Sequence, residues 1–179
     1  ILDDALAGHR RYTGPEAAPL DVAARDARRI EQWMRDHLGL LVRIPARTTR
    51  GEVPEGARVT TVGGHPAAHV VYGGDGRQLS LFVARTPREP LPEEGEHVVD
   101  GAEVYARAVG GQTLGWWQDR HHLFVAVVPA TEDDLIALAA QCLRGQRGLA
   151  AAAPGFTPTR PNAGRALLPV SSPSSGRMG

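Results

Sequence analysis

Histidine has the widest chemical repertoire of the residue types in this chain, because its imidazole can bind a metal, transfer protons or change charge near neutral pH. The chain holds seven histidines. His65 and His69 share a strand face if the strand is continuous, and His121 and His122 are adjacent. A zinc site needs three or four converging ligands. Since Pro66 disturbs the first pair and adjacent strand residues point to opposite faces, the sequence predicts surface and turn histidines, with no metal or cofactor bound by this chain.

Two adjacent tryptophans make the tetrapeptide Trp116-Trp117-Gln118-Asp119 the most unusual in the sequence. In a strand their indoles point to opposite faces of the sheet. The inward indole is expected to pack in the core, as large aromatic side chains commonly do. The outward indole either covers the sheet edge or forms a flat platform for a ligand. Trp116, Trp117 and Asp119 are therefore the candidate ligand or partner surface.

The motifs that usually identify an enzyme are missing from the sequence. The single cysteine, Cys142, falls on the apolar stripe of a predicted helix, where a thiol acts as a small hydrophobe. The glycine-rich segments 63–64 and 73–76 precede neither Lys-Ser/Thr nor a helix, which favours hairpin turns over phosphate-binding loops. Neither Gly-x-Ser-x-Gly nor His-Glu-x-x-His occurs. We predict a non-enzymatic protein; an enzyme with an unrecognised site is the weakest alternative, because no nucleophile–base pair can be named.

Composition indicates one globular domain and gives no electrostatic reason to expect a nucleic-acid partner. The chain has 179 residues, 42% hydrophobic content and zero formal net charge. One cysteine excludes an internal disulfide. The chain begins without Met, has no signal peptide and lacks an apolar run near the ~20 residues that span a bilayer. The expectation is a piece of a longer protein.

Hydrophobic periodicity predicts an α+β fold, in which a mixed, mainly antiparallel sheet of about five to six strands carries two helices on one face. The centre is a meander of three strands over residues 59–84, joined by the glycine-rich turns, with one sheet face buried and one available. Asp21 is the expected N-cap of the first of these helices. The other predicted elements are a helix over residues 22–38, strands over 40–44, 104–108, 113–118 and 121–128, and a helix from Thr131 to about Gly145.

Three further segments flank or interrupt the expected domain of residues 20–145. Residues 1–12 have helical spacing of apolar side chains. Residues 85–103 alternate proline with acidic side chains, which predicts an exposed, mobile acidic loop. Residues 146–179 contain no Asp or Glu and are rich in Gly, Pro, Ala, Ser and Arg, which predicts a disordered basic tail.

Several segments together resemble a known family. They are His9-Arg10-Arg11-Tyr12, the helix over residues 26–33, the stretch Gly-x-Pro-Ala-Ala-x-Val-Val-Tyr at 64–72, Leu-Ser-Leu-Phe-Val at 79–83 and Trp116-x-x-Asp119, followed by an apolar strand and a helix with an acidic start. In this order they are similar to the extracytoplasmic domain of bacterial transmembrane anti-sigma factors. The resemblance covers roughly residues 5–145 and is based on order and spacing.

The resemblance implies a three-part protein that controls an extracytoplasmic-function sigma factor. An N-terminal cytoplasmic domain, absent from this chain, would bind zinc and the sigma factor, and a membrane helix, also absent, would follow it. Residues 1–19 would then be the juxtamembrane segment and residues 20–145 a periplasmic sensor domain at the inner membrane, open to a periplasmic protein or protease. The chain departs from the family after His122, where residues 124–129 replace the usual Trp and Ser-Asp pair. The competing interpretation is a soluble small-ligand-binding domain that uses the Trp116/Trp117 face.

Overall fold

The computed structural model describes residues 1–12 and 19–152, which form three helices and eight strands. All eight strands form a single sheet in the order β1-β2-β3-β4-β8-β7-β6-β5, and every neighbouring pair is antiparallel. The elements are α1 (Leu2–Tyr12), β1 (Val22–Ala23), α2 (Ala27–Leu38), β2 (Val53–Val62), β3 (His65–Gly74), β4 (Arg77–Arg85), β5 (Glu96–Val99), β6 (Ala102–Val109), β7 (Gln112–Gln118), β8 (His122–Val128) and α3 (Glu132–Ala152).

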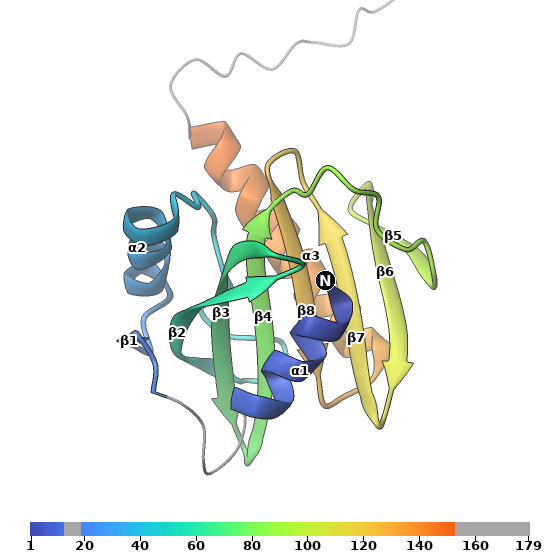
Figure 1. Ribbon diagram of the computed structural model, residues 1–179, viewed down its shortest axis with the longest axis horizontal. Helices are drawn as coiled ribbons and strands as arrows, with labels where there is room; N and C mark the ends of the chain where they lie inside the picture. The colour runs from blue at the N-terminus through green and yellow to red at the C-terminus, as the bar shows by residue number, and fades with distance from the viewer. Residues whose placement is uncertain (13–18, 153–179) are drawn as a thin grey trace, which may run out of the picture.

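The predicted α+β class is confirmed, and the count of elements is corrected. The sheet has eight strands where five to six were expected, and it is wholly antiparallel. The meander is present as β2, β3 and β4, with β3 pairing to both neighbours along nearly its whole length. β8 then pairs with β4 and connects the meander to the β5–β7 half of the sheet (Figure 1).

Both faces of the sheet are covered, which corrects the expectation of one free face. α2 and α3 share one apolar core with the sheet, so the two predicted helices do lie on one face. α1 lies on the opposite face, in front of the central strands in Figure 1, and shares a second core with them. The continuous burial of β8 fits this arrangement, because a strand covered on both sides needs apolar residues at every position. Among the described residues, no helix is both long and apolar enough to cross a membrane.

The start of α2 and the segment that follows the helix both differ from the prediction. α2 begins after Asp26, whose side chain accepts a hydrogen bond from the Arg28 backbone N–H, because the residues after Asp21 pair with β2 as β1. Its predicted stop is confirmed: Gly39 is left-handed, with φ of 64°. Residues 40–44 are not a strand, although Leu40, Val42 and Ile44 are buried.

Two predicted irregular segments contain regular structure. Residues 85–103 include β5 and the start of β6, and only the crossover segment, residues 86–95, is irregular. This segment is attached to the sheet: Thr86 N–H donates to the His121 carbonyl at 2.9 Å, and Trp116 Nε1 donates to the Pro92 carbonyl at 2.9 Å. The last helix continues to Ala152, beyond the predicted end, and the rest of the predicted tail lies outside the described residues.

Gly115 of β7 lies close against Leu135 of α3, and it offers a test of this packing. A Cβ at Gly115 would lie 2.1 Å from Leu135 Cδ2. Gly115→Ala is therefore expected to lower the free energy of unfolding by about 1–3 kcal/mol through overpacking. Gly148→Ala is the matched control on α3, because no atom lies within 4 Å of a Cβ there. It should raise that free energy by about 0.5–1 kcal/mol. Urea denaturation measures both, and equal effects of the two variants would contradict this packing.

Candidate functional site

The two tryptophans predicted as a ligand surface are both enclosed. Trp116 has 0% of its surface exposed and stacks on Tyr105 at 5.8 Å between ring centroids. Trp117 has 1% exposed and stacks on Phe124 at 5.5 Å on the other face. Their opposite directions follow the prediction, but the face expected to be open is covered by α1 and the crossover segment. Neither indole presents an accessible stacking platform.

Asp119 organises the turn between β7 and β8. Its Oδ1 accepts hydrogen bonds from the backbone N–H groups of His121 and His122, each at 2.7 Å. Burial alone would raise the pKa of Asp119, but these bonds and the His122 imidazole hold it below its ordinary value. Asp119 therefore stabilises the turn between β7 and β8. It does not form an open surface together with Trp116 and Trp117, which are buried.

The remaining candidate residues are dispersed. His65 is exposed and 4.0 Å from Glu89, whereas His69 is fully buried on the α1 face of β3. No group of three or more His, Cys, Asp or Glu side chains that could hold a metal ion occurs within residues 1–12 and 19–152. Cys142 lies on the buried side of α3, and burial raises the pKa of its thiol to about 12.

A buried polar cluster that the sequence analysis did not single out lies between α1 and the sheet. His9 Nδ1 is 2.9 Å from Ser80 Oγ, and His69 Nε2 is 2.7 Å from the same oxygen. His9 comes from α1, His69 from β3 and Ser80 from β4. All three side chains are buried, with exposed fractions of 3%, 0% and 0%. We call these three residues the His–Ser–His cluster.

Aromatic and cationic side chains enclose this cluster. The His69 ring stacks on Phe82 at 4.3 Å between centroids, and Tyr12 at the end of α1 lies 5.8 Å from it. Arg58 of β2 sits over the Tyr12 ring at 4.2 Å, a cation–π arrangement. Tyr12 at the helix end thus contacts side chains of two neighbouring strands, Arg58 of β2 and His69 of β3.

Both imidazoles are held neutral at physiological pH. Burial, with a smaller contribution from Arg10, lowers the pKa of His9 to about 4. Burial, followed by the charges of Arg58 and His9, lowers the pKa of His69 to about 3. His69 Nδ1 is buried and has no hydrogen-bond partner among the described residues. The surroundings of the cluster therefore disfavour a positive charge on either imidazole.

The arrangement of one hydroxyl and two imidazoles does not fit nucleophilic catalysis. A serine nucleophile must reach a substrate, and Ser80 has no exposed surface beneath α1. α1 supplies His9 to the cluster and packs on the same face of the sheet. The hydrogen bonds of the cluster therefore serve to attach α1 to the sheet.

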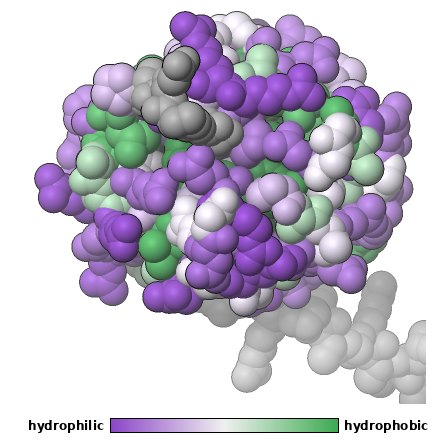
Figure 2. Space-filling model, turned by 90° about the horizontal axis from the view of Figure 1, so that it is seen from below, coloured by the Kyte–Doolittle hydropathy of each residue, from purple (hydrophilic) through white to green (hydrophobic). Residues whose placement is uncertain are grey.

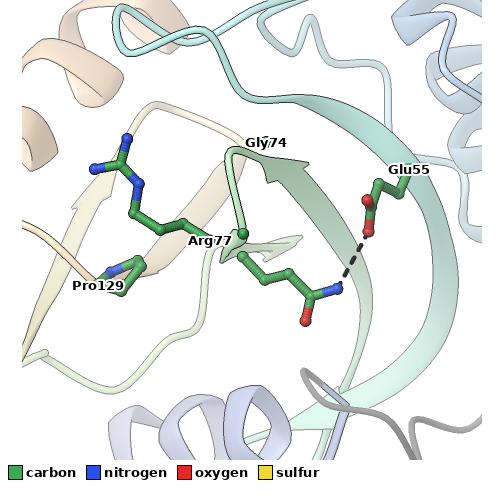
Figure 3. A pocket seen from close by; sticks show the side chains of 6 residues that line it. Glu55, Gly74, Arg77 and Pro129 are labelled. Atoms are coloured by element: carbon green, nitrogen blue, oxygen red, sulfur yellow. Dashed lines mark hydrogen bonds between the residues drawn. The ribbon is translucent and has the colours of Figure 1, made fainter.

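A second site candidate is a shallow hollow at the opposite side of the meander, near the β3–β4 turn. It has a volume of about 480 Å³ and is lined by Glu55, Gly74, Gly76, Arg77, Gln78 and Pro129. Glu55 and Arg77 lie on opposite sides of it, and Gln78 donates to Glu55 at 3.3 Å (Figure 3). The surface seen in Figure 2 is mostly hydrophilic, with small separate apolar areas. The hollow shows no buried polar group directed into it, so we rank it below the His–Ser–His cluster.

Comparison of the chain with known proteins gives no match: no family model, no curated protein and no solved structure matches it.

Proposed function

We propose that this chain is the non-enzymatic extracytoplasmic sensor domain of a membrane-anchored anti-sigma factor. Its partner would be a sigma factor, bound by a cytoplasmic domain outside this chain, and its own location would be the periplasmic side of the inner membrane. Zinc would belong to that cytoplasmic domain. Three of the segments that carry the family resemblance support the proposal, because they belong to one sheet, in β3, β4 and the end of β7.

The observation that carries the proposal is the docking of α1. In the family, the residues before the sensor domain lead from the membrane. Here α1 buries Leu2, Ala5, Leu6 and His9 against the sheet. A helix that is docked on one side and continuous with an upstream segment on the other could transmit a change between the two by leaving and returning to the sheet.

The decisive experiment is to sequence the coding DNA upstream of Ile1. The proposal expects an apolar segment of ~20 residues directly before it, preceded by a His and Cys-x-x-Cys cluster. A signal peptide in that place would favour the competing interpretation, a free ligand-binding domain. An in-frame Met with neither feature would overturn the family assignment.

We further infer that a periplasmic protease or protein partner acts on the crossover segment. Residues 88–90 and 92–95 of this segment are exposed, and they belong to no helix or strand. Limited proteolysis of the native chain should give its earliest cuts in this segment, because exposed irregular backbone opens most easily, or in the tail that the sequence predicts to be disordered. First cuts within β2, β3 or β4 would count against this part of the proposal.

A further inference from the structure

The His–Ser–His cluster places two titratable side chains in the contact that holds α1. A hydroxyl donates one hydrogen and accepts others. With both imidazoles neutral, Ser80 can therefore donate to one ring nitrogen and accept from the other, at the observed 2.9 and 2.7 Å. The rest of the contact is mainly apolar, from α1 and from Phe82, Leu123, Val125 and Val127 of the sheet. In the neutral state the three atoms that meet at Ser80 Oγ have complementary donor and acceptor roles, whereas His69 Nδ1 has no partner among the described residues.

Protonation disrupts this pattern. A proton added to the ring that accepts from Ser80 turns its facing nitrogen into a donor, so the hydroxyl hydrogen loses its acceptor within the cluster. The added charge also meets cations: Arg10 of α1 acts on His9, and Arg58 of β2 acts on His69. Tyr12 is the phenol-bearing neighbour on α1, and the carboxylate of Asp21 acts on Arg58. β8 faces this side with the apolar residues Leu123, Val125 and Val127.

We propose that the His–Ser–His cluster is a proton-operated latch, in which protonation of His9 and His69 releases α1 while the sheet, α2 and α3 stay folded. The retained part keeps its own core, formed by α2, α3 and the other sheet face. This inference adds to the proposed function the condition, pH, that controls the docking of α1. It rests on the proposed function only where the release of α1 is taken to be the signal sent to the upstream domain.

The direction of the pH effect follows from linkage. In the docked state the pKa of His9 is about 4 and that of His69 about 3, whereas exposure on release returns both toward 6.5. The released state therefore binds more protons, so docking is fully favoured above pH 6.5 and weakens as the pH falls from 6.5 toward 4. Each proton taken up changes the docking equilibrium by up to about tenfold per pH unit, and two protons change it by up to about 100-fold.

Distance measurements between two spin labels test the latch on the full chain. One label is placed on α1 at Ala7→Cys and the other on β6 at Ala108→Cys, both exposed positions, with Cys142→Ala to remove the native thiol. At pH 7.5 we expect one narrow distance distribution. Between pH 6 and pH 4.5 a second, broader component should grow by at least tenfold relative to the first. A reference pair at Thr61→Cys and Ala108→Cys should keep one distance throughout, because both positions lie on the sheet.

The matched variant keeps the hydrogen bonds and removes the titration. His9→Asn places an amide near the position of Nδ1, and His69→Gln places one near Nε2, so the double variant can still bond to Ser80 without gaining charge. Its docked fraction should change less than threefold over the same pH range. The control His65→Gln/His121→Gln alters two exposed imidazoles and should respond to pH as the parent does.

Three results would overturn the latch: a parent distance that is unchanged at pH 4.5, an equal response in the double variant, or a reference pair that changes together with the α1 pair. If the double variant does not fold, the His9 and His69 imidazole resonances of the parent decide by NMR. Their titration must coincide with the release of α1. If these experiments contradict the latch, the sequence upstream of Ile1 still tests the anti-sigma proposal independently. A failure of the latch can therefore be distinguished from a failure of the proposed function.

Discussion

An Ala5→Arg substitution is expected to detach α1 from the sheet and to lower the free energy of unfolding by about 3 kcal/mol. Ala5 has no exposed surface and lies in the core shared by α1 and the sheet. A guanidinium cannot be buried there without a partner, so the helix must leave. Its departure exposes Leu2 and Leu6, each worth about 1.5–3 kcal/mol when fully buried, offset by the entropy that a detached helix regains.

Ala7→Arg is the control for this prediction, because Ala7 is exposed on the same helix. It changes charge and helix propensity equally and should alter the free energy of unfolding by less than about 0.5 kcal/mol. Urea denaturation gives the stability, and binding of a hydrophobic dye reports the newly exposed sheet face. An Ala5→Arg protein with the stability and dye binding of the Ala7→Arg protein would show that α1 docking contributes little.

The sequence pattern predicted the elements that carry their own local signals. The glycine-rich turns set the meander, and Gly39 set the end of α2. The start of α2 was wrong because Asp21 and Asp26 are both competent N-caps, and the choice between them is made by pairing of β1 with β2, more than 30 residues away. Such long-range pairing leaves no trace in local propensity.

The second covered face was predictable in part. An unbroken apolar run in β8 is typical of a strand buried on both sides, and it conflicts with a sheet that has one free face. The helical spacing of residues 1–12 provides the cover for that face. The apolar stripe of this segment packs on the sheet of the same domain.

The His–Ser–His cluster was the hardest feature to find, because His9 and Ser80 are 71 residues apart. One signal does exist in the sequence. Ser80 stands inside an apolar strand, between Leu79 and Leu81, and a polar side chain on a covered face needs a hydrogen-bond partner. The sequence could predict that Ser80 has a partner, but only the packing of α1 across β3 and β4 identifies both imidazoles.

Trp116→Ala is expected to lower the free energy of unfolding by about 3–5 kcal/mol, the usual range for a buried tryptophan, and to release the crossover segment. Its indole N–H donates to the Pro92 carbonyl at 2.9 Å, and Leu91 of the same segment packs on the core that contains it. Trypsin should then cleave after Arg88, an exposed residue of that segment, much faster than in the parent.

Trp117→Ala separates release of the crossover segment from general loss of stability. Trp117 is equally buried but packs in the core shared with α2 and α3, so its truncation should cost a similar 3–5 kcal/mol. In conditions where both variants remain folded, cleavage after Arg88 should be at least tenfold faster for Trp116→Ala. If both variants are cleaved at rates that follow their stabilities alone, Trp116 does not anchor the segment. A selective effect would make the attachment of Pro92 to Trp116 the step that limits access of a protease to this face.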